Sequence, residues 1–306
     1  MKKKTKKKMS RGQKELMSLC IVPVLFVFVF SYLPMFGVLM AFKNYKYDLG
    51  ILKSPWVGFD NFMYFFNGDD FWRLTRNTLT LNFVFIVVGM LSALIFAIML
   101  YELKSRRTIK IYQTIAITPT FISWVIVGFV SYIFLHPENG IINLVLEKLG
   151  MEGIDWYSTP RAWPIILTIF FVWKNAGMDA IIYYATMMGL DAELYEAAAL
   201  DGANRFKQAI YITIPGIVPV LITMFILKIG NIFRADFGLF YQLTRNCGAL
   251  YSTTDVMDTY IYRTMRVFGD MSTSAAMGLL QSVVGFVTVI IANAIVKRID
   301  SDKSMF

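Results

Sequence analysis

The hydrophobic pattern of the chain consists of six long apolar runs, separated by polar or aromatic connections. Each run is long enough to cross the hydrocarbon core of a bilayer, which takes about 20 apolar residues in a helix. The runs occupy residues 16–42, 77–101, 111–135, 163–188, 211–233 and 274–296. Pro119 and Pro164 lie inside two of these runs, where neighbouring helices and hydroxyl groups can satisfy the backbone groups that a proline frees. The pattern therefore predicts an all-α integral membrane protein with six transmembrane helices.

The composition agrees with this prediction. Of the 306 residues, 57% are hydrophobic and only 17% are charged, whereas a soluble domain is about 25% charged. Phenylalanine alone contributes 26 residues. A soluble core of this size does not need so much apolar surface, but a bilayer accepts it as a solvent.

The basic residues indicate the orientation of the chain, because Lys and Arg concentrate in the cytoplasmic connections of membrane proteins. They cluster in the N-terminal tail, after the second and fourth runs, and at the C-terminus: Lys2, Lys3, Lys4, Lys6, Lys7, Lys8, Arg11, Lys14, Lys104, Arg106, Arg107, Lys110, Arg205, Lys207, Lys297, Arg298 and Lys303. Most of the other basic residues are spread over longer connections. Both termini are therefore expected in the cytoplasm. The first run is expected to remain as a signal anchor, because no small-residue cleavage site closes it.

The net charge of +9 also raises the question of nucleic acid as a partner. No aromatic or glycine residues interleave the lysines of residues 2–8, so we expect no nucleic-acid binding. The tail either sets the topology or is attracted to anionic lipid of the inner leaflet. Membrane lipid is the partner that both interpretations share.

The sequence offers little to catalysis or metal binding. Cys20 lies in the first run and Cys247 in an outer connection, so the two cannot meet, and His136 is the only histidine. No GxxxxGK[ST] loop or other glycine-rich phosphate cradle is present. We therefore expect no metal site, no cofactor in this chain and no ATPase or other enzymatic activity.

The connection after the fourth run, residues 191–215, predicts two short helices. Asp191 can cap the start of the first helix, and Gly202 suits the left-handed position that ends one. A second short helix is expected from about Ala203 to Pro215, whose ring marks the start of the fifth span. Helices of this length are not stable alone, so the loop needs a partner surface.

A motif with fixed spacing runs through this loop, and its members are Glu196, Ala197, Ala198, Asp201, Gly202, Ala203, Phe206 and Pro215. It resembles the EAA motif of the permease subunits of binding-protein-dependent ABC importers. Phe206 and Ile214 differ from the commoner Trp and Leu, which affects fine packing only. The resemblance implies a type I importer permease fold, divided into a basic cytoplasmic tail (1–15), a first helix with its outer loop (16–76), a five-helix permease core (77–298) with its coupling loop (191–215), and a cytoplasmic tail (299–306).

The resemblance implies that this chain is one subunit of a larger assembly. Its expected partners are a second homologous permease in a heterodimer, two ATPase subunits that bind ATP and Mg, and an extracellular solute-binding lipoprotein. In such importers the EAA helix docks in a groove of the ATPase. Glu196 would make a polar contact there, Ala197 and Ala198 would permit close approach, and Gly202 would let the chain turn.

Residues 34–45 and 56–62 resemble carbohydrate-uptake permeases, especially the lipoprotein- or polysaccharide-type subgroup of Gram-positive bacteria. This implies import of oligosaccharides or polysaccharide fragments across a bacterial, Gram-positive plasma membrane. An importer for another solute stays open as an alternative. A secondary transporter is the third possibility, although such proteins more often show inverted repeats.

Polar residues within the fourth and fifth runs are the candidates for the substrate path. They are Trp173, Lys174 and Asn175, together with Lys228 and Asn231. An ammonium near the membrane centre is expensive unless it faces a polar cavity or a partner. The alternative for both lysines is an interhelical hydrogen bond or ion pair.

The first and second outer connections are rich in aromatic residues: Trp56, Phe59, Phe62, Tyr64, Phe65, Phe66, Phe71, Trp72, Trp156 and Tyr157. An aromatic belt at the membrane interface is one interpretation. Docking of the solute-binding protein is the other.

Overall fold

The structure is a computed structural model that describes residues 11–299. Most of the predicted basic tail, and all but the first residue of the predicted C-terminal tail, lie outside the described residues. The α-helices are α1 Arg11–Val27, α2 Gly50–Lys53, α3 Asp60–Phe66, α4 Asp70–Tyr101, α5 Arg106–Ile117, α6 Trp124–Leu135, α7 Ile141–Lys148, α8 Trp163–Met187, α9 Ala192–Leu200, α10 Arg205–Gln208, α11 Ile214–Ile229, α12 Phe237–Leu243, α13 Tyr251–Thr254, α14 Met257–Arg266 and α15 Met271–Ile299.

Shorter helical segments join some of these elements. Two are π-helical, Phe28–Tyr32 and Ala209–Thr213. In both cases the second residue after the segment is a proline, Pro34 or Pro215. The 3₁₀ segments are Leu33–Phe42, Thr118–Phe121, Trp156–Ser158, Pro160–Ala162 and Gly248–Leu250. Within residues 11–299 the extended backbone forms a single isolated bridge, between Lys43 and Trp56, and no strand. The prediction of an all-helical protein is confirmed.

Five helical stretches are long and apolar enough to cross a membrane: Met17–Phe42, Asp70–Tyr101, Pro160–Met187, Arg205–Ile229 and Met271–Arg298. They match five of the six predicted spans. The second begins seven residues earlier than predicted, because Asp70 starts a helix that runs unbroken to Tyr101.

The third predicted span, residues 111–135, is not a single helix in the structure. Arg106–Phe121 and Trp124–Leu135 are long and apolar enough to cross a membrane only when taken together, and they are bent by 97° at the break between them. Pro119 is the second residue of the 3₁₀ turn Thr118–Phe121, and the Ser123 side chain accepts a hydrogen bond from the Ile126 N–H and so starts a new helix. The expectation of one helix that absorbs its proline was therefore wrong: the helix ends, turns and begins again.

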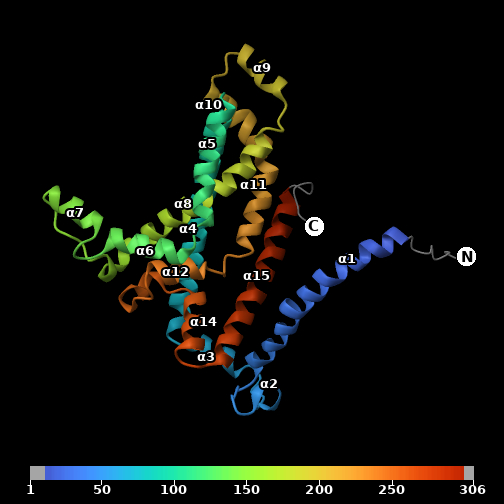
Figure 1. The fold of residues 1–306 in the computed structure, drawn as a ribbon, viewed down its shortest axis with the longest axis vertical. Helices are drawn as coiled ribbons and strands as arrows, with labels where there is room; N and C mark the ends of the chain where they lie inside the picture. The colour runs from blue at the N-terminus through green and yellow to red at the C-terminus, as the bar shows by residue number, and fades with distance from the viewer. Residues whose placement is uncertain (1–10, 300–306) are drawn as a thin grey trace, which may run out of the picture.

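The centre of the molecule is the pair α4 and α8 (Figure 1). Ala93 and Ala97 on α4 let α8 approach closely, and Ala180, Tyr183 and Met187 on α8 are fully buried against them. Membrane helices associate through small residues of this kind, because lipid provides no hydrophobic drive to bring helices together.

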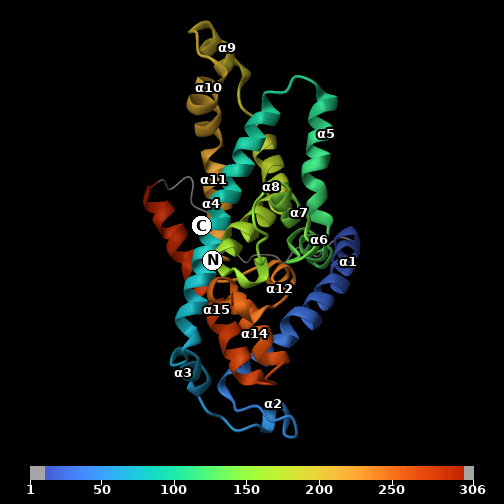
Figure 2. The same cartoon turned by 90° about the vertical axis from the view of Figure 1, so that its left-hand side faces the viewer.

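The two ends of the molecule differ (Figures 1 and 2). The α9–α10 loop and the α4–α5 connection lie at one end, and α2 and α3 lie at the other. At the α2–α3 end, the fully buried carboxylate of Asp255 binds Arg73 at 3.0 Å and Arg263 at 2.8 Å. This network joins α4 to the segment around α14 and so orders the connection between the fifth and sixth spans.

Candidate functional site

The projecting loop 191–215 closes its first helix, α9, with its own residues. The Asp191 carboxylate accepts a hydrogen bond from the Glu193 N–H at 3.0 Å. At the other end, Gly202 has a φ of +79°, and the N–H groups of Gly202 and Ala203 bind the carbonyls of Ala199 and Ala198. This is the double hydrogen bond of a left-handed helix terminus. The predicted start and end of this helix are both confirmed.

The second half of the loop differs from the expected separate helix. Asn204 caps α10 by accepting from the Lys207 N–H at 2.9 Å. The helix then continues through the π-helical segment Ala209–Thr213 into α11, without a gap. Pro215 lies within the first residues of α11 and does not interrupt the span. A π-helical turn is a common way for a helix to accommodate a local interruption.

The loop is strongly exposed, although it is anchored at its base. No residue of α9 is buried, and Leu200 and Phe206 are 91% and 73% exposed. Glu196 is exposed and makes no ion pair or side-chain hydrogen bond within residues 11–299. At the base, the Tyr195 hydroxyl hydrogen-bonds Thr213 at 2.9 Å, and Arg205 lies 3.6 Å from Glu102. The loop is thus held in place while its apolar and acidic side chains face outward.

The other members of the motif share this placement. Ala197 and Asp201 are exposed, and Ala198 and Ala203 are half-buried. Small residues at the surface of a short helix allow another backbone to approach closely, which is what a docking contact requires. The functional role of these residues stays a prediction.

Lys174 on α8 lies in the break of the bent span. Its side chain is 8% exposed, and its ammonium donates to the carbonyls of Pro119 at 3.0 Å, Thr120 at 3.1 Å and Ile122. It also lies 5.1 Å from the centre of the Trp124 ring. The three hydrogens of the ammonium therefore have backbone partners, and the carbonyls that the break frees are satisfied. These contacts match the interhelical alternative, and any contact of Lys174 with substrate stays a prediction.

Lys228 on α11 forms the ion pair that the alternative interpretation expects. Its ammonium lies 2.8 Å from the carboxylate of Asp179 on α8, and both side chains are mostly buried. Sequence reasoning missed Asp179, although an acidic residue inside the fourth span was a signal for a partner.

A pocket of about 350 Å³ opens beside Lys228 and Asn231, and although six of its eleven lining residues are apolar, we call it the polar pocket after its five polar side chains. Its other polar lining residues, none of them predicted, are Asn82, Arg234 and Asp236. Asn82 donates to the carbonyls of Ile232 and Arg234 at 2.7 and 3.2 Å, and so holds the end of α11 against α4. The pocket combines amide, cationic and carboxylate groups, which suits a ligand with many hydroxyl groups.

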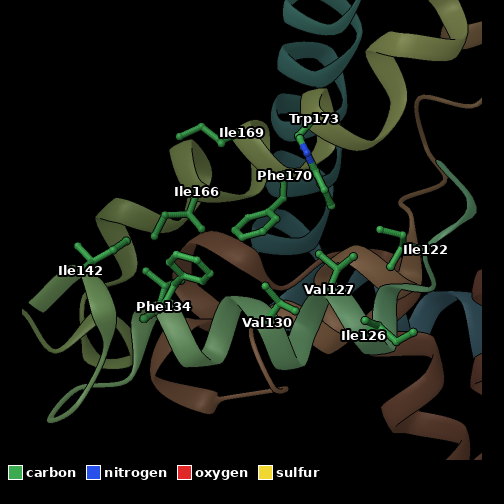
Figure 3. Close-up of a pocket in the computed structure, with 11 residues that line it drawn as sticks. Ile122, Ile126, Val127, Val130, Phe134, Ile142, Ile166, Ile169, Phe170 and Trp173 are labelled. Carbon is green, nitrogen blue, oxygen red and sulfur yellow. The ribbon is translucent and has the colours of Figure 1, made fainter. Parts of the chain in front are cut away.

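The predicted trio Trp173, Lys174 and Asn175 does not converge on one site. Trp173 is 46% exposed and lines an apolar cavity of about 460 Å³ between α6 and α8, with Phe170, Val130 and Phe134 (Figure 3). The Asn175 amide donates to the Phe171 carbonyl of its own helix at 3.0 Å. Because consecutive helix residues point about 100° apart, the three side chains face different surroundings.

Asp258 at the start of α14 is a half-buried acid outside the spans. Burial raises the pKa of its carboxyl group above the usual value, and hydrogen bonds from the Ala235 N–H at 2.7 Å and the Gln281 amide at 3.2 Å partly oppose that rise. The carboxylate thus links α14 to the chain after α11 and to α15. Across residues 11–299, the structure contains no cluster of three or more His, Cys, Asp or Glu side chains that could hold a metal ion.

The chain matches a known protein family and is similar in sequence to several known proteins. Residues 86–301 match the family model described as the inner membrane component of binding-protein-dependent transport systems. The chain is 37% identical to the protein LplB of Bacillus subtilis over 95% of its own length and 91% of LplB. It is 33% identical to the polygalacturonan/rhamnogalacturonan transport system permease protein YteP of the same organism, over 94% of this chain and 89% of YteP.

Solved structures give the same picture. A chain in the crystal structure of a bacterial ABC transporter involved in the import of the acidic polysaccharide alginate superposes with a TM-score of 0.85 at 33% identity, covering 95% of this chain and 97% of that one. A second structure, of that kind of transporter in complex with an alginate pentasaccharide-bound periplasmic protein, gives a TM-score of 0.84 at 32% identity, covering 94% and 96%.

Proposed function

The chain belongs to the family of inner membrane components of binding-protein-dependent transport systems, and from this premise we propose that it is the permease subunit of an ATP-driven importer of oligosaccharides or polysaccharide fragments. The observation that carries the proposal is the projecting α9–α10 loop. It is capped by its own residues and anchored at its base, yet it leaves Glu196, Leu200 and Phe206 without partners within the described chain. A loop built in this way presents a surface to another protein.

The proposed orientation puts both termini and the α9–α10 loop in the cytoplasm. The α4–α5 connection, which contains Lys104, and the start of α5, which contains Arg106 and Arg107, lie at the same end of the molecule as that loop (Figures 1 and 2). This agrees with the rule that Lys and Arg mark the cytoplasmic side. The segments around α2, α3 and α14 then face outward, where a solute-binding lipoprotein can reach their aromatic residues. The membrane is the plasma membrane of a bacterium, and the resemblance of residues 34–45 and 56–62 favours a Gram-positive one.

The proposed mechanism divides the work among subunits. Two partner ATPases bind ATP and Mg, and their closure moves the α9–α10 loops of two permeases. In this chain Glu196 supplies a polar contact to the ATPase, Ala197 and Ala198 allow close approach, and Gly202 holds the turn. Because α10 continues into α11 as one helical rod, a displacement of the loop is transmitted to the fifth span and to Lys228 and Asn231 beside the polar pocket.

A carbohydrate substrate is supported by the relatives and by the pocket chemistry. YteP is named for polygalacturonan and rhamnogalacturonan, and the solved neighbour for alginate. Lysine and asparagine donors, such as those of Lys228 and Asn231, suit sugar hydroxyl groups. A second, homologous permease completes the path, because a single chain of five or six spans does not enclose a channel for an oligosaccharide.

The decisive test is Glu196→Lys in the complete assembly, reconstituted with its ATPases, second permease and solute-binding protein. We expect the variant to insert and fold normally, since Glu196 is exposed and its side chain makes no ion pair or hydrogen bond in the described chain. Both oligosaccharide uptake and the stimulation of ATP hydrolysis by the loaded binding protein should fall at least tenfold. The reason is that the substitution reverses a charge whose contact at the interface is worth about 1.5–3 kcal/mol.

Glu193→Lys is the matched control. Glu193 also lies on α9 and is exposed, but it is not part of the motif. Retained uptake in Glu196→Lys, or equal loss in both variants, would contradict the proposed docking role.

A further inference from the structure

A shallow hollow between α6 and α12 is separate from the polar pocket beside Lys228. It has a volume of about 170 Å³ and is lined by Val125, Gly128, Phe129, Tyr132, Tyr241, Gln242 and Arg245. The two helices come together at Gly128, where a Cβ atom would lie 2.9 Å from the Gln242 carbonyl oxygen. Any larger residue at this position would push α12 away, so the close approach forms the floor of the hollow.

The aromatic walls of the hollow are fixed by packing. The Tyr241 ring stacks on Phe237 with centroids 4.9 Å apart and meets Tyr262 edge-on at 5.2 Å. On the opposite side, Tyr132 packs edge-on against Tyr157 at 5.6 Å. Rigid aromatic faces of this kind contribute contact area at a low cost in side-chain entropy.

Three polar groups that line the hollow are available to a ligand. Within residues 11–299, the Arg245 guanidinium, the Gln242 amide and the Tyr132 hydroxyl have no hydrogen-bond or ion-pair partner. The guanidinium lies over the Tyr132 ring, 3.9 Å from its centroid. Stacking occupies the face of a guanidinium and leaves the N–H groups at its edge free to form a fork around a carboxylate.

The backbone that presents Arg245 is strained. Arg245 and Asn246 have φ angles of 55° and 50°, and they are the only non-glycine residues with positive φ in the described chain. The turn is held by Asn246, whose carbonyl and side-chain oxygens accept from the Tyr251 hydroxyl at 3.2 and 3.0 Å. Strained residues persist where the surroundings over-determine them, and they concentrate at ligand sites.

We propose that this hollow binds a single uronate unit of an acidic oligosaccharide. The sugar carboxylate pairs with the edge of the Arg245 guanidinium, a hydroxyl group pairs with the Gln242 amide, and the ring packs against Tyr241. The hollow is too small for a whole oligosaccharide, since pockets for drug-sized ligands are about 300–1,000 Å³. The proposal rests on the importer function and orientation proposed above, which put α12 and the end of α6 on the outer side, where substrate is delivered.

The test measures binding directly in the full permease–ATPase assembly in lipid nanodiscs, without solute-binding protein. The probes are trigalacturonate and its carboxyl-reduced, neutral counterpart, at equal ionic strength. We expect wild type to bind trigalacturonate about tenfold more tightly than the neutral probe, as for one added charge-assisted contact. Arg245→Gln should abolish this preference and leave binding of the neutral probe within about twofold.

Two further variants separate loss of the site from loss of folding. Arg245→Gly removes the guanidinium and relaxes the positive φ, so it should fold at least as well as wild type while losing the preference for the acidic probe. Arg161→Gln is the matched control, because Arg161 is an exposed arginine of the same outer region that does not line the hollow. It should behave as wild type.

Several outcomes would overturn the proposal. The first is equal binding of both probes by wild type, and the second is an equal loss of the preference for trigalacturonate in Arg245→Gln and Arg161→Gln. The third is competition by acetate as effective as that by trigalacturonate, which would indicate a site for any small anion. Stimulation of ATP hydrolysis by the solute-binding protein reports the importer function separately. Intact stimulation without discrimination between the probes rejects the hollow alone, and discrimination without stimulation rejects the importer alone.

Discussion

Two regions of this molecule interrupt the run of membrane helices, and they are built in opposite ways. In the α9–α10 loop, the caps at Asp191, Gly202 and Asn204 bind backbone groups two to five residues away. At the break between α5 and α6, the freed carbonyls are bound by Lys174, which lies 52 to 55 residues further along the chain. The first region closes its helix ends with local hydrogen bonds and leaves its outer side chains free to meet a partner, whereas the break in the second region depends on α8 being packed against it.

The largest effect on stability is expected for Lys174→Met, which removes the hydrogen-bond donor at the break between α5 and α6. The variant leaves the Thr120 and Ile122 carbonyls without their lysine donor, whereas the Pro119 carbonyl still accepts from the Ile122 N–H. Each unsatisfied buried polar group costs about 1–3 kcal/mol. We expect the free energy of unfolding to fall by about 3 kcal/mol or more, measured as a lower Tm of the assembly in detergent. Lys148→Met on exposed α7 is the control. An unchanged Tm in Lys174→Met would show that the break does not depend on the ammonium.

The Lys228–Asp179 pair joins α8 to α11 and is expected to rank next. Asp179→Asn leaves a mostly buried ammonium without its counter-charge, so the assembly should lose about 2–3 kcal/mol of stability. The double variant Asp179→Asn with Lys228→Met should recover part of that loss, because it removes the orphaned charge. A thermal-unfolding double-mutant cycle measures the coupling. Purely additive losses would mean that the two side chains do not interact.

Gly202→Ala probes the self-sufficient loop and should have a smaller effect. A φ of +79° costs a residue with a Cβ atom about 1–2 kcal/mol, but the loop is exposed and can fray locally. We therefore expect little change in the Tm of the spans and a clear loss of coupling between ATP hydrolysis and uptake. Gly150→Ala is the matched control, since Gly150 also has positive φ, at +78°, in a connection far from the loop in sequence. Equal loss of coupling in both variants would argue against a special role for the α9–α10 turn.

The smallest expected effect is a pH dependence at Asp258. Burial raises the pKa of this carboxyl group in the folded state, so the folded chain binds the proton more tightly than the unfolded chain does. Its contribution to stability is therefore complete below the ordinary carboxyl pKa of 3.8, and it is lost as pH rises through the elevated value. Asp258→Asn should flatten the dependence of Tm on pH above the ordinary carboxyl pKa of 3.8. An identical slope in wild type and variant would remove Asp258 as its source.

The candidate sites show how far sequence reasoning reached. The bounds of α9 followed from Asp191 and Gly202, because a cap and a left-handed glycine act on their immediate neighbours. The continuity of α10 with α11 was missed, because no sequence signal near Pro215 predicts the π-helical segment that allows this proline to lie within a continuous helix. The partners of Lys174 and Lys228 stayed open for a related reason: each is an interhelical contact, and a single sequence does not say which faces of two helices meet.

The sequence by itself determined the membrane class, five of the spans and the caps of the projecting loop. Each of these depends on transfer of apolar side chains to lipid or on hydrogen bonds between near neighbours. Only the tertiary structure decided that the third run breaks at Pro119, that Lys174 closes the break, and that Arg245 meets Tyr132 and Gln242 in one hollow. These features arise where segments distant in sequence satisfy each other's polar groups, because buried carbonyls and charges in a membrane take whichever partner the packing of helices brings to them.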